Sequence, residues 1–139
     1  MQEQSSGSSI EDEMNYTELE KLLDSGGRVG FIKPTDSPDY LGWILIAKIE
    51  ANRRLLELVT EAEAPALVQE ERRRLVQPYM VLQIELKRSI HEAGEYETES
   101  DYRQKERLWF GDLEAVAEQL RQWGYELQDA RSARELDAP

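Results

Sequence analysis

The sequence predicts a mainly helical fold, an irregular bundle of a short N-terminal helix and three longer helical segments. Composition is the first observation behind this prediction, because Ala, Glu, Lys, Leu and Arg make up 66 of the 139 residues and Val, Ile and Thr only 17. Such a balance favours helices over strands. The second observation is that apolar residues recur every three or four positions in the long segments, which is typical of helices with one buried face.

The domain limits follow from local composition. Residues 1–14 are rich in Ser, Gln and acidic residues and predict a flexible acidic tail. We expect one globular domain over 15–127 and a frayed C-terminus over 128–139. Within the domain, Asn15 and Glu18 have the spacing of a capping box and predict a short first helix over 15–24.

The first long helix is predicted to begin at Ser37, in the stretch TDSPDY. Serine is a good N-cap, proline fits the first helical position, and Asp39 then lies in the first turn, where the helix dipole favours an acid. The stretch lacks the acid spacing of a calcium loop and the glycines of a P-loop. Apolar residues continue beyond it at helical spacing: Leu41, Leu45, Ile49, Leu56 and Val59.

Two more helical segments follow. One begins at Pro65 and is interrupted by Pro78. The other begins near Ser100, and Asp112 either lies at a kink in it or caps a fresh helix. The stripe of this last segment is apolar apart from Glu106: Tyr102, Glu106, Trp109, Leu113, Val116, Leu120 and Trp123.

The segment 79–88 is ambiguous, because it alternates like a strand and also carries a helical stripe. Composition favours the helix. The alternative is an α+β fold with a small antiparallel sheet and helices near 15–24, 66–76 and 113–123. Its strands would be Val29–Lys33, Trp43–Glu50, Leu55–Thr60, Tyr79–Arg88 and Arg107–Phe110.

The net charge of −12 limits the classes of partner that we expect. With 29 acidic and 17 basic residues, the chain repels nucleic acid and anionic membranes, so we expect neither as a partner. It contains no cysteine, which excludes disulfides and suits a reducing compartment. The longest apolar run, Trp43–Ala47, is too short to span a bilayer, and the N-terminus lacks the pattern of a signal peptide. We therefore expect a soluble cytoplasmic protein.

The sequence contains no recognisable catalytic or metal-binding pattern. His91 is the only histidine, so a two-histidine metal site cannot be assembled, and we expect its side chain to be solvated. No nucleophile-elbow pattern surrounds Ser25, Ser89 or Ser100. We expect no enzyme, metal or cofactor. The functional hypothesis is a non-catalytic acidic interaction protein that binds a basic protein, as an immunity- or antitoxin-like neutraliser or a charge-mimicking regulator does. The alternative is a small enzyme with paired carboxylates in a cleft, with or without a divalent metal.

The candidate contacts with such a partner lie in the densest acidic stretch and beside Ser37. Tyr40 and Trp43 are either core anchors or exposed aromatic contacts. The basic cluster Arg72–Arg74 is interpreted as a solvated helix face, with binding to a second copy, and hence a homo-oligomer, left open. The acidic stretch is interpreted as either the contact for a basic partner or solvated surface: Glu92, Glu95, Glu97, Glu99 and Asp101.

Overall fold

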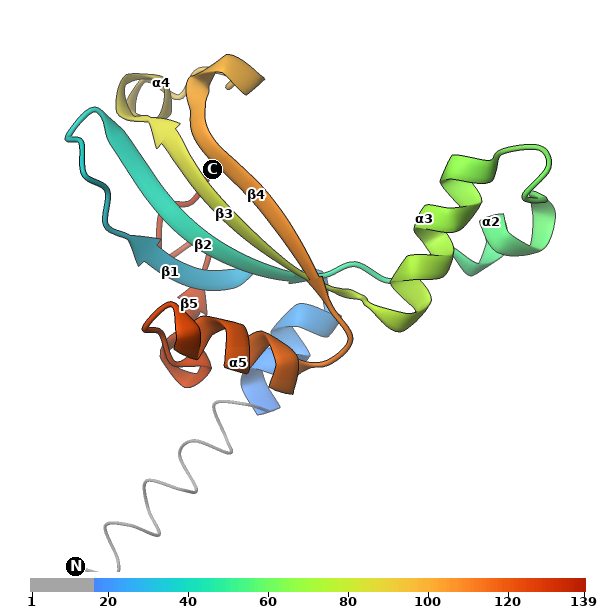
Figure 1. Cartoon of the computed structure of the whole chain (residues 1–139). Coiled ribbons are helices and arrows are strands. Elements are labelled where there is room, and N and C mark those ends of the chain that lie inside the picture. Colours follow the sequence, from blue (N-terminus) through green and yellow to red (C-terminus); the bar gives the residue numbers. More distant parts are fainter. Residues whose placement is uncertain (1–16) are drawn as a thin grey trace, which may run out of the picture.

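The computed structural model describes residues 17–139 and shows an α+β fold. Its centre is one five-stranded sheet in the order β4-β3-β2-β1-β5, with antiparallel neighbours throughout (Figure 1). The predicted mainly helical bundle is therefore wrong, and the α+β alternative is closer. The strands are β1 (Val29–Lys33), β2 (Tyr40–Lys48), β3 (Tyr79–Lys87), β4 (Tyr102–Phe110) and β5 (Arg131–Ser132). The helices are α2 (Arg53–Leu58), α3 (Pro65–Val76), α4 (Arg88–Ala93), α5 (Leu113–Gln122) and the 3-10 helices η1 (Glu99–Asp101) and η2 (Leu127–Asp129).

Residues 17–24 are also helical. The acidic tail expected over 1–14 and the cap expected at Asn15 lie outside the described residues. Among residues 17–139, no helix combines the length and the apolar character that a bilayer crossing requires.

β2 explains why helical periodicity was misleading. It is a central strand, and its run Trp43–Ala47 is buried on both faces of the sheet. A strand buried on both faces is continuously apolar, so the period of two disappears and the run cannot be distinguished from a buried helix. The helix predicted from Ser37 to Val59 is instead β2 followed by the short α2. The alternative was also wrong here, because it placed a strand at Leu55–Thr60.

The stretch around Ser37 is the turn between β1 and β2 and does not begin a helix. Ser37 Oγ accepts a hydrogen bond from the backbone N–H of Asp39 at 3.2 Å. The hydroxyl of Thr35 has one proton and two possible acceptors. Its Oγ1 lies 2.7 Å from the carbonyl oxygen of Ser37 and 2.9 Å from the carbonyl oxygen of Tyr40. Ser, Asp and Pro serve turns for the same reasons that they serve helix starts, namely side-chain bonds to nearby backbone and a fixed φ.

One face of the sheet is covered by α5 and by helical residues 17–24 (Figure 1). α5 places Leu113, Val116 and Leu120 on this core. The helical segment predicted from Ser100 is therefore wrong in its first half, which is the edge strand β4, whereas its second half is helical. Trp109 accordingly lies on β4, where the guanidinium of Arg74 covers its ring at 4.8 Å.

The C-terminal residues cover the opposite face of the sheet, although a frayed end was expected over 128–139. Ala133 and Leu136 are buried against Trp43 and Leu45. The indole N–H of Trp43 donates to the carbonyl of Leu136 at 2.9 Å. A buried hydrogen bond of this kind satisfies the polar atom of tryptophan while its ring fills the core.

Asp112 caps α5, which was one of the two interpretations of this residue. Its Oδ1 accepts a hydrogen bond from the backbone N–H of Ala115 at 2.8 Å. Replacing Asp112 with alanine should lower the free energy of unfolding by about 1 kcal/mol, the usual cost of losing such a cap. Urea unfolding followed by tryptophan fluorescence measures this. Asp129→Ala, an exposed acid without a capping bond, should change stability by less than about 0.5 kcal/mol; equal losses for the two variants would refute the capping role.

Candidate functional site

The candidate site lies at the end of the sheet where the β1–β2 turn, α4 and the loop after α4 meet (Figure 1). Arg88, the first residue of α4, joins these parts. Its backbone N–H donates to the carbonyl of Asp39 at 2.8 Å, and its Nε donates to the carbonyl of Pro38 at 2.6 Å. The turn and the helix are thereby fixed relative to each other.

The acidic loop, residues 92–101, is held at both ends. Gly94 ends α4 with φ of 68°, a left-handed conformation that glycine adopts without strain. At the other end, the backbone N–H of Thr98 donates to Asp101 Oδ2 at 2.8 Å within a capping box that begins η1. This hydrogen bond to Thr98 is the main cause that lowers the pKa of Asp101. The residues between these two anchors are all exposed.

The acids of the loop differ in how far they are already neutralised. Glu99 pairs with Lys105 at 2.8 Å, and this contact lowers the pKa of Glu99. Glu92 pairs more loosely with Arg88, at 3.4 Å. Glu97 accepts a hydrogen bond from the hydroxyl of Tyr102 at 3.3 Å. Burial of that hydroxyl, together with the charge of Glu97, raises the pKa of Tyr102 to about 12. The side chain of Glu95 contacts no charged group among residues 17–139, so the charge is most available at Glu95 and Glu97.

Tyr96 lies between these two glutamates and is 99% exposed. The sequence-based prediction missed this residue and named Tyr40 and Trp43 as the aromatic contacts. In the sequence, Tyr96 could have been identified only as an aromatic residue inside an otherwise polar and acidic stretch. Large aromatic side chains are usually at least partly covered, so full exposure at the tip of an anchored loop distinguishes Tyr96 from the other tyrosines.

The two aromatic residues predicted as contacts have different positions. Tyr40 begins β2 and is partly exposed, with the guanidinium of Arg103 at 4.6 Å from its ring centroid. Trp43 is only 3% exposed and belongs to the core, so it offers almost no surface to a partner. His91, predicted to be solvated, packs edge-on against Trp43 at 4.9 Å and is largely buried. Its Nε2 lies 3.3 Å from Asp137 Oδ2 without hydrogen-bond alignment.

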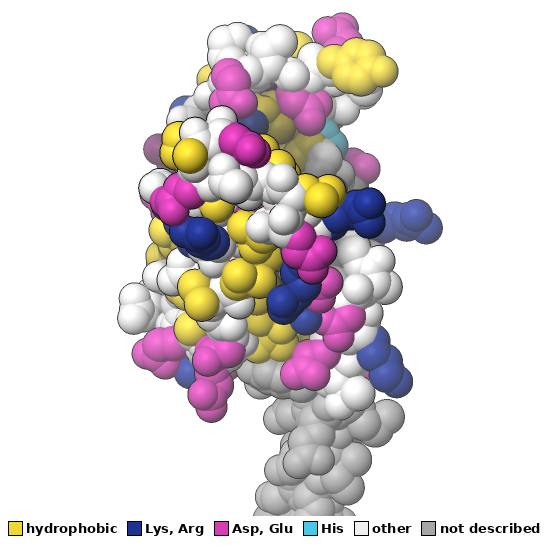
Figure 2. All heavy atoms as spheres, turned by 90° about the vertical axis from the view of Figure 1, so that its right-hand side faces the viewer, with side chains coloured by type: hydrophobic (Ala, Val, Ile, Leu, Met, Phe, Trp, Pro, Cys, Tyr) yellow, Lys and Arg dark blue, Asp and Glu magenta, His cyan; other side chains and the backbone are white. Residues whose placement is uncertain are grey.

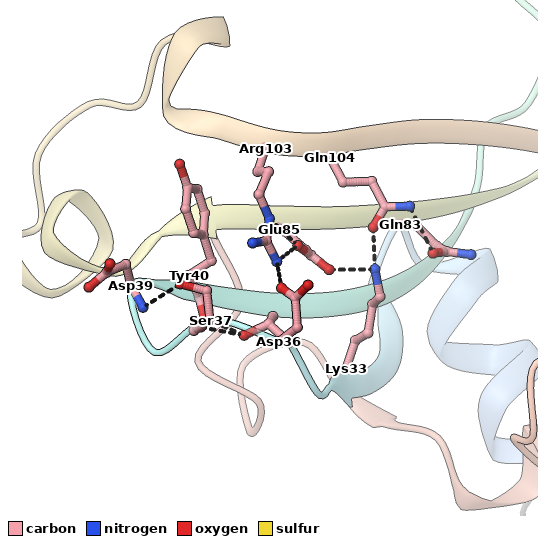
Figure 3. A network of polar contacts seen from close by, with 10 residues as sticks. Lys33, Asp36, Ser37, Asp39, Tyr40, Gln83, Glu85, Arg103 and Gln104 are labelled. Carbon is pink, nitrogen blue, oxygen red and sulfur yellow. Dashed lines mark hydrogen bonds and ion pairs between the residues drawn. The ribbon is translucent and has the colours of Figure 1, made fainter.

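A polar network crosses the sheet beside the acidic loop (Figure 3). Lys33 Nζ donates to Glu85 Oε2 at 2.8 Å and also to Gln104. Arg103 donates to Glu85 from Nε at 2.7 Å and from Nη2, and its Nη2 also lies 2.7 Å from Asp36. One carboxylate thus holds two cations from β1 and β4, on either side of the two central strands.

Strand register explains why Lys33 reaches Glu85. Lys33, Gly42, Glu85 and Gln104 are successive partners across β1, β2, β3 and β4. Gly42 has no side chain to separate its two neighbours, and a Cβ there would lie 2.6 Å from the carbonyl oxygen of Lys33. The glycine is therefore required for the close approach.

Glu85 is buried, with 8% of its surface exposed. Burial raises its pKa, but the hydrogen bonds from Lys33 and Arg103 outweigh this effect and leave the pKa below its ordinary value. A carboxylate that accepts three donors of two cations is fully engaged. We interpret the network as a structural support of the loop-bearing end of the sheet.

The described residues offer no paired buried carboxylates in a cleft. Glu71 and Glu85 are the buried acids, and they lie on α3 and β3 respectively. An open cavity of about 590 Å³ lies between the β1–β2 turn and the C-terminal segment, and its two carboxylates, Asp36 and Asp137, are exposed. Within 17–139, no cluster of three or more His, Asp or Glu side chains could hold a metal ion.

No family model, curated protein or solved structure matches this chain.

Proposed function

We propose that this chain is a non-catalytic interaction protein that binds a basic protein partner through the acidic loop, as a neutraliser of a toxin or nuclease or as a charge-mimicking regulator. The observation that carries the proposal is Tyr96, fully exposed between Glu95 and Glu97 at the tip of an anchored loop. The proposal includes a cytoplasmic location, which the absence of cysteine suits.

The chemistry of the loop fits lysine and arginine side chains. A tyrosine ring attracts a cation over its face, and flanking carboxylates accept charge-assisted hydrogen bonds from the same group. Tyrosine is also enriched among the residues that dominate binding energy at interfaces. The loop thus combines an aromatic anchor with charge of one sign, a combination that favours a basic surface.

The fixed ends of the loop and the charge of the whole chain support the same conclusion. Anchoring at Gly94 and Thr98 reduces the conformational freedom that binding would otherwise have to remove. The net charge of −12 steers a basic protein towards the molecule and repels nucleic acid and anionic lipid. The alternative of a small enzyme with paired carboxylates has no supporting observation among residues 17–139.

The test begins with capture of partners from the native host on the wild-type chain and on a variant that combines Glu95→Gln, Tyr96→Ala and Glu97→Gln. We expect a basic protein to bind the wild type and to be lost from the variant. Surface plasmon resonance should then show association at least tenfold slower at low salt for the variant, with a flatter salt dependence, because exposed charges act mainly on the encounter rate.

A matched control removes the same charge elsewhere. Glu20 and Glu126 are exposed acids on the helical side of the molecule, and Glu20→Gln with Glu126→Gln should leave the association rate within about twofold. The loop variant should retain the stability of the wild type, since exposed substitutions usually change it by less than about 0.5 kcal/mol. Equal association of the loop variant and the wild type at low salt would reduce the loop to solvated surface.

A further inference from the structure

Residues 49–78 form a helical hairpin, α2 and α3 with their connection, at the opposite end of the sheet from the acidic loop. Figure 1 shows the hairpin projecting away from the sheet. It leaves β2 after Lys48 and returns at Tyr79, and these two residues are register partners. The ladder continues one step beyond them, where the N–H of Ile49 donates to the carbonyl of Pro78 at 2.7 Å. The hairpin is thus a protrusion on a closed stem.

The hairpin buries little of its own apolar surface. α2 has six residues and none is buried, and α3 has twelve residues of which only Val68 and Glu71 are buried. The carboxylate of Glu71 serves the backbone, accepting a hydrogen bond from the N–H of Asn52 at 2.7 Å. Helices shorter than about 12–15 residues are marginal in water unless packing supports them. One buried valine provides little such support.

Apolar side chains are instead exposed on this protrusion. Leu58 is 66% exposed and Val76 is 69% exposed, while Leu67 and Leu75 are also exposed. Together they account for four of the six large exposed hydrophobic residues among residues 17–139, so the exposed apolar surface is concentrated here. Such concentration marks an interaction surface.

Charge indicates which partner fits this surface. The hairpin carries six acidic and five basic residues, a net charge of −1 in a chain of −12. Two copies that meet through their hairpins therefore repel each other less than copies that meet through the more acidic parts of the surface. Figure 2, which views the molecule from the hairpin side, shows acidic, basic and hydrophobic side chains intermixed on this face.

Four charged residues of the hairpin that form no ion pair among residues 17–139 are arranged by sign along it. Arg53 and Arg73 lie near the stem, where α2 begins and α3 ends, whereas Glu57 and Glu63 lie near the connection between the helices. None of these four side chains makes an ion pair within the described part of the chain. An antiparallel pair of hairpins places the basic stem of each copy beside the acidic tip of the other. It also places Leu58 of each copy at the level of Val76 of the other.

We propose that the hairpin is the contact between two copies of this chain, related by a twofold axis with the hairpins antiparallel. In such an interface every contact occurs twice, so a surface that carries both signs at opposite ends is complementary to itself. A strongly basic partner would meet the unpaired arginines and a strongly acidic one the unpaired glutamates. A second copy satisfies both sets and covers the exposed leucines and valine.

The size of the hairpin determines how strongly we expect two copies to associate. α3 is only about 18 Å long at 1.5 Å per residue, so the interface lies at the small end of those found between proteins, below about 800 Å² per partner. The dimer is therefore weak and forms at high concentration. Added salt should strengthen it, because screening reduces the repulsion between two chains of −12.

The experiment is sedimentation equilibrium of the full chain from micromolar to near-millimolar concentration. We expect a monomer–dimer equilibrium, with the dissociation constant raised at least tenfold by Leu58→Glu and by Val76→Glu. Both side chains are already largely exposed, so both variants should fold, which circular dichroism checks. The control is Ile32→Glu, because Ile32 is 64% exposed but lies on β1; its dissociation constant should change by less than threefold.

Cross-linking tests the antiparallel arrangement independently, since the chain has no cysteine of its own. A mixture of Leu58→Cys and Val76→Cys treated with a short bismaleimide should yield the mixed dimer at least tenfold faster than Ile32→Cys yields its own dimer. A monomer at every concentration would overturn the proposal. A dimer equally insensitive to all three glutamate variants, or cross-linking no faster than the Ile32→Cys control, would also overturn it.

Discussion

Replacement of Leu120 by alanine is expected to lower the free energy of unfolding by roughly 2–5 kcal/mol. Leu120 lies on α5, is completely buried, and packs in the core that α5 and residues 17–24 form against the sheet. Truncation removes apolar contacts and leaves a cavity that this core, closed by helices on one side and by β-strands on the other, can fill only in part. Urea unfolding followed by tryptophan fluorescence gives the change.

The control for this variant is Leu58→Ala, the same chemical change at a leucine that is largely exposed. Measured in dilute solution, it should cost less than about 1 kcal/mol. The slope of the free energy against urea should stay unchanged for Leu120→Ala, because the surface exposed on unfolding is nearly the same. A loss for Leu120→Ala no larger than that for Leu58→Ala would show that α5 does not close this core.

The second large effect is expected for Glu85→Gln, at about 3 kcal/mol. Removing one partner of a buried ion pair typically costs about 3–5 kcal/mol, because the other charge is left without compensation. The lower end applies here, since Arg103 keeps part of its side chain in solvent and retains Asp36 as a partner. Lys33 loses its only ion-pair partner among residues 17–139.

The same network predicts a dependence on pH. The pKa of Glu85 is lower in the folded protein than its ordinary value of 4.5. A lowered folded pKa means that this stabilisation is complete above the ordinary value and is lost as the pH falls through the folded value. The difference in stability between the wild type and Glu85→Gln should therefore be constant near neutral pH and shrink below about pH 4.5.

Glu106→Gln is the matched control, because Glu106 is an exposed acid on β4, two residues beyond Gln104. It should change stability by less than about 0.5 kcal/mol at neutral pH. Thermal unfolding at a series of pH values compares the three proteins. A difference between wild type and Glu85→Gln that persists undiminished at acid pH would disprove the electrostatic origin of the effect.

The sequence predicted elements well where one face is buried and the other is not. The stripe of α5 reflects such a face. In Tyr79–Lys87 the alternation comes from the polar residues Gln83 and Glu85 between apolar ones, although Glu85 is itself buried. The α+β alternative placed both elements almost correctly. β2 lacks alternation because both of its faces are covered, so periodicity alone could not identify it. Composition then misled, because many of the good helix formers belong to the hairpin at 49–78 and not to the core.

The candidate site was predictable only in its charge. Five acids in ten residues identified the loop at 92–101, but neither the exposure of Tyr96 nor the burial of Trp43 is a local property of the sequence. Trp43 is buried because residues near Leu136, far along the chain, cover it. The network at Glu85 was likewise invisible, since it requires the register of four strands to bring Lys33 and Arg103 together.

The stem of the hairpin makes the chain modular. Because Lys48 and Tyr79 face each other in the ladder, a short hairpin turn can join β2 directly to β3. Everything between them can then be exchanged or deleted without altering the register of the sheet. The proposed contact between two copies and the proposed contact with a basic partner lie at opposite ends of the same strands, so changes at one need not affect the other.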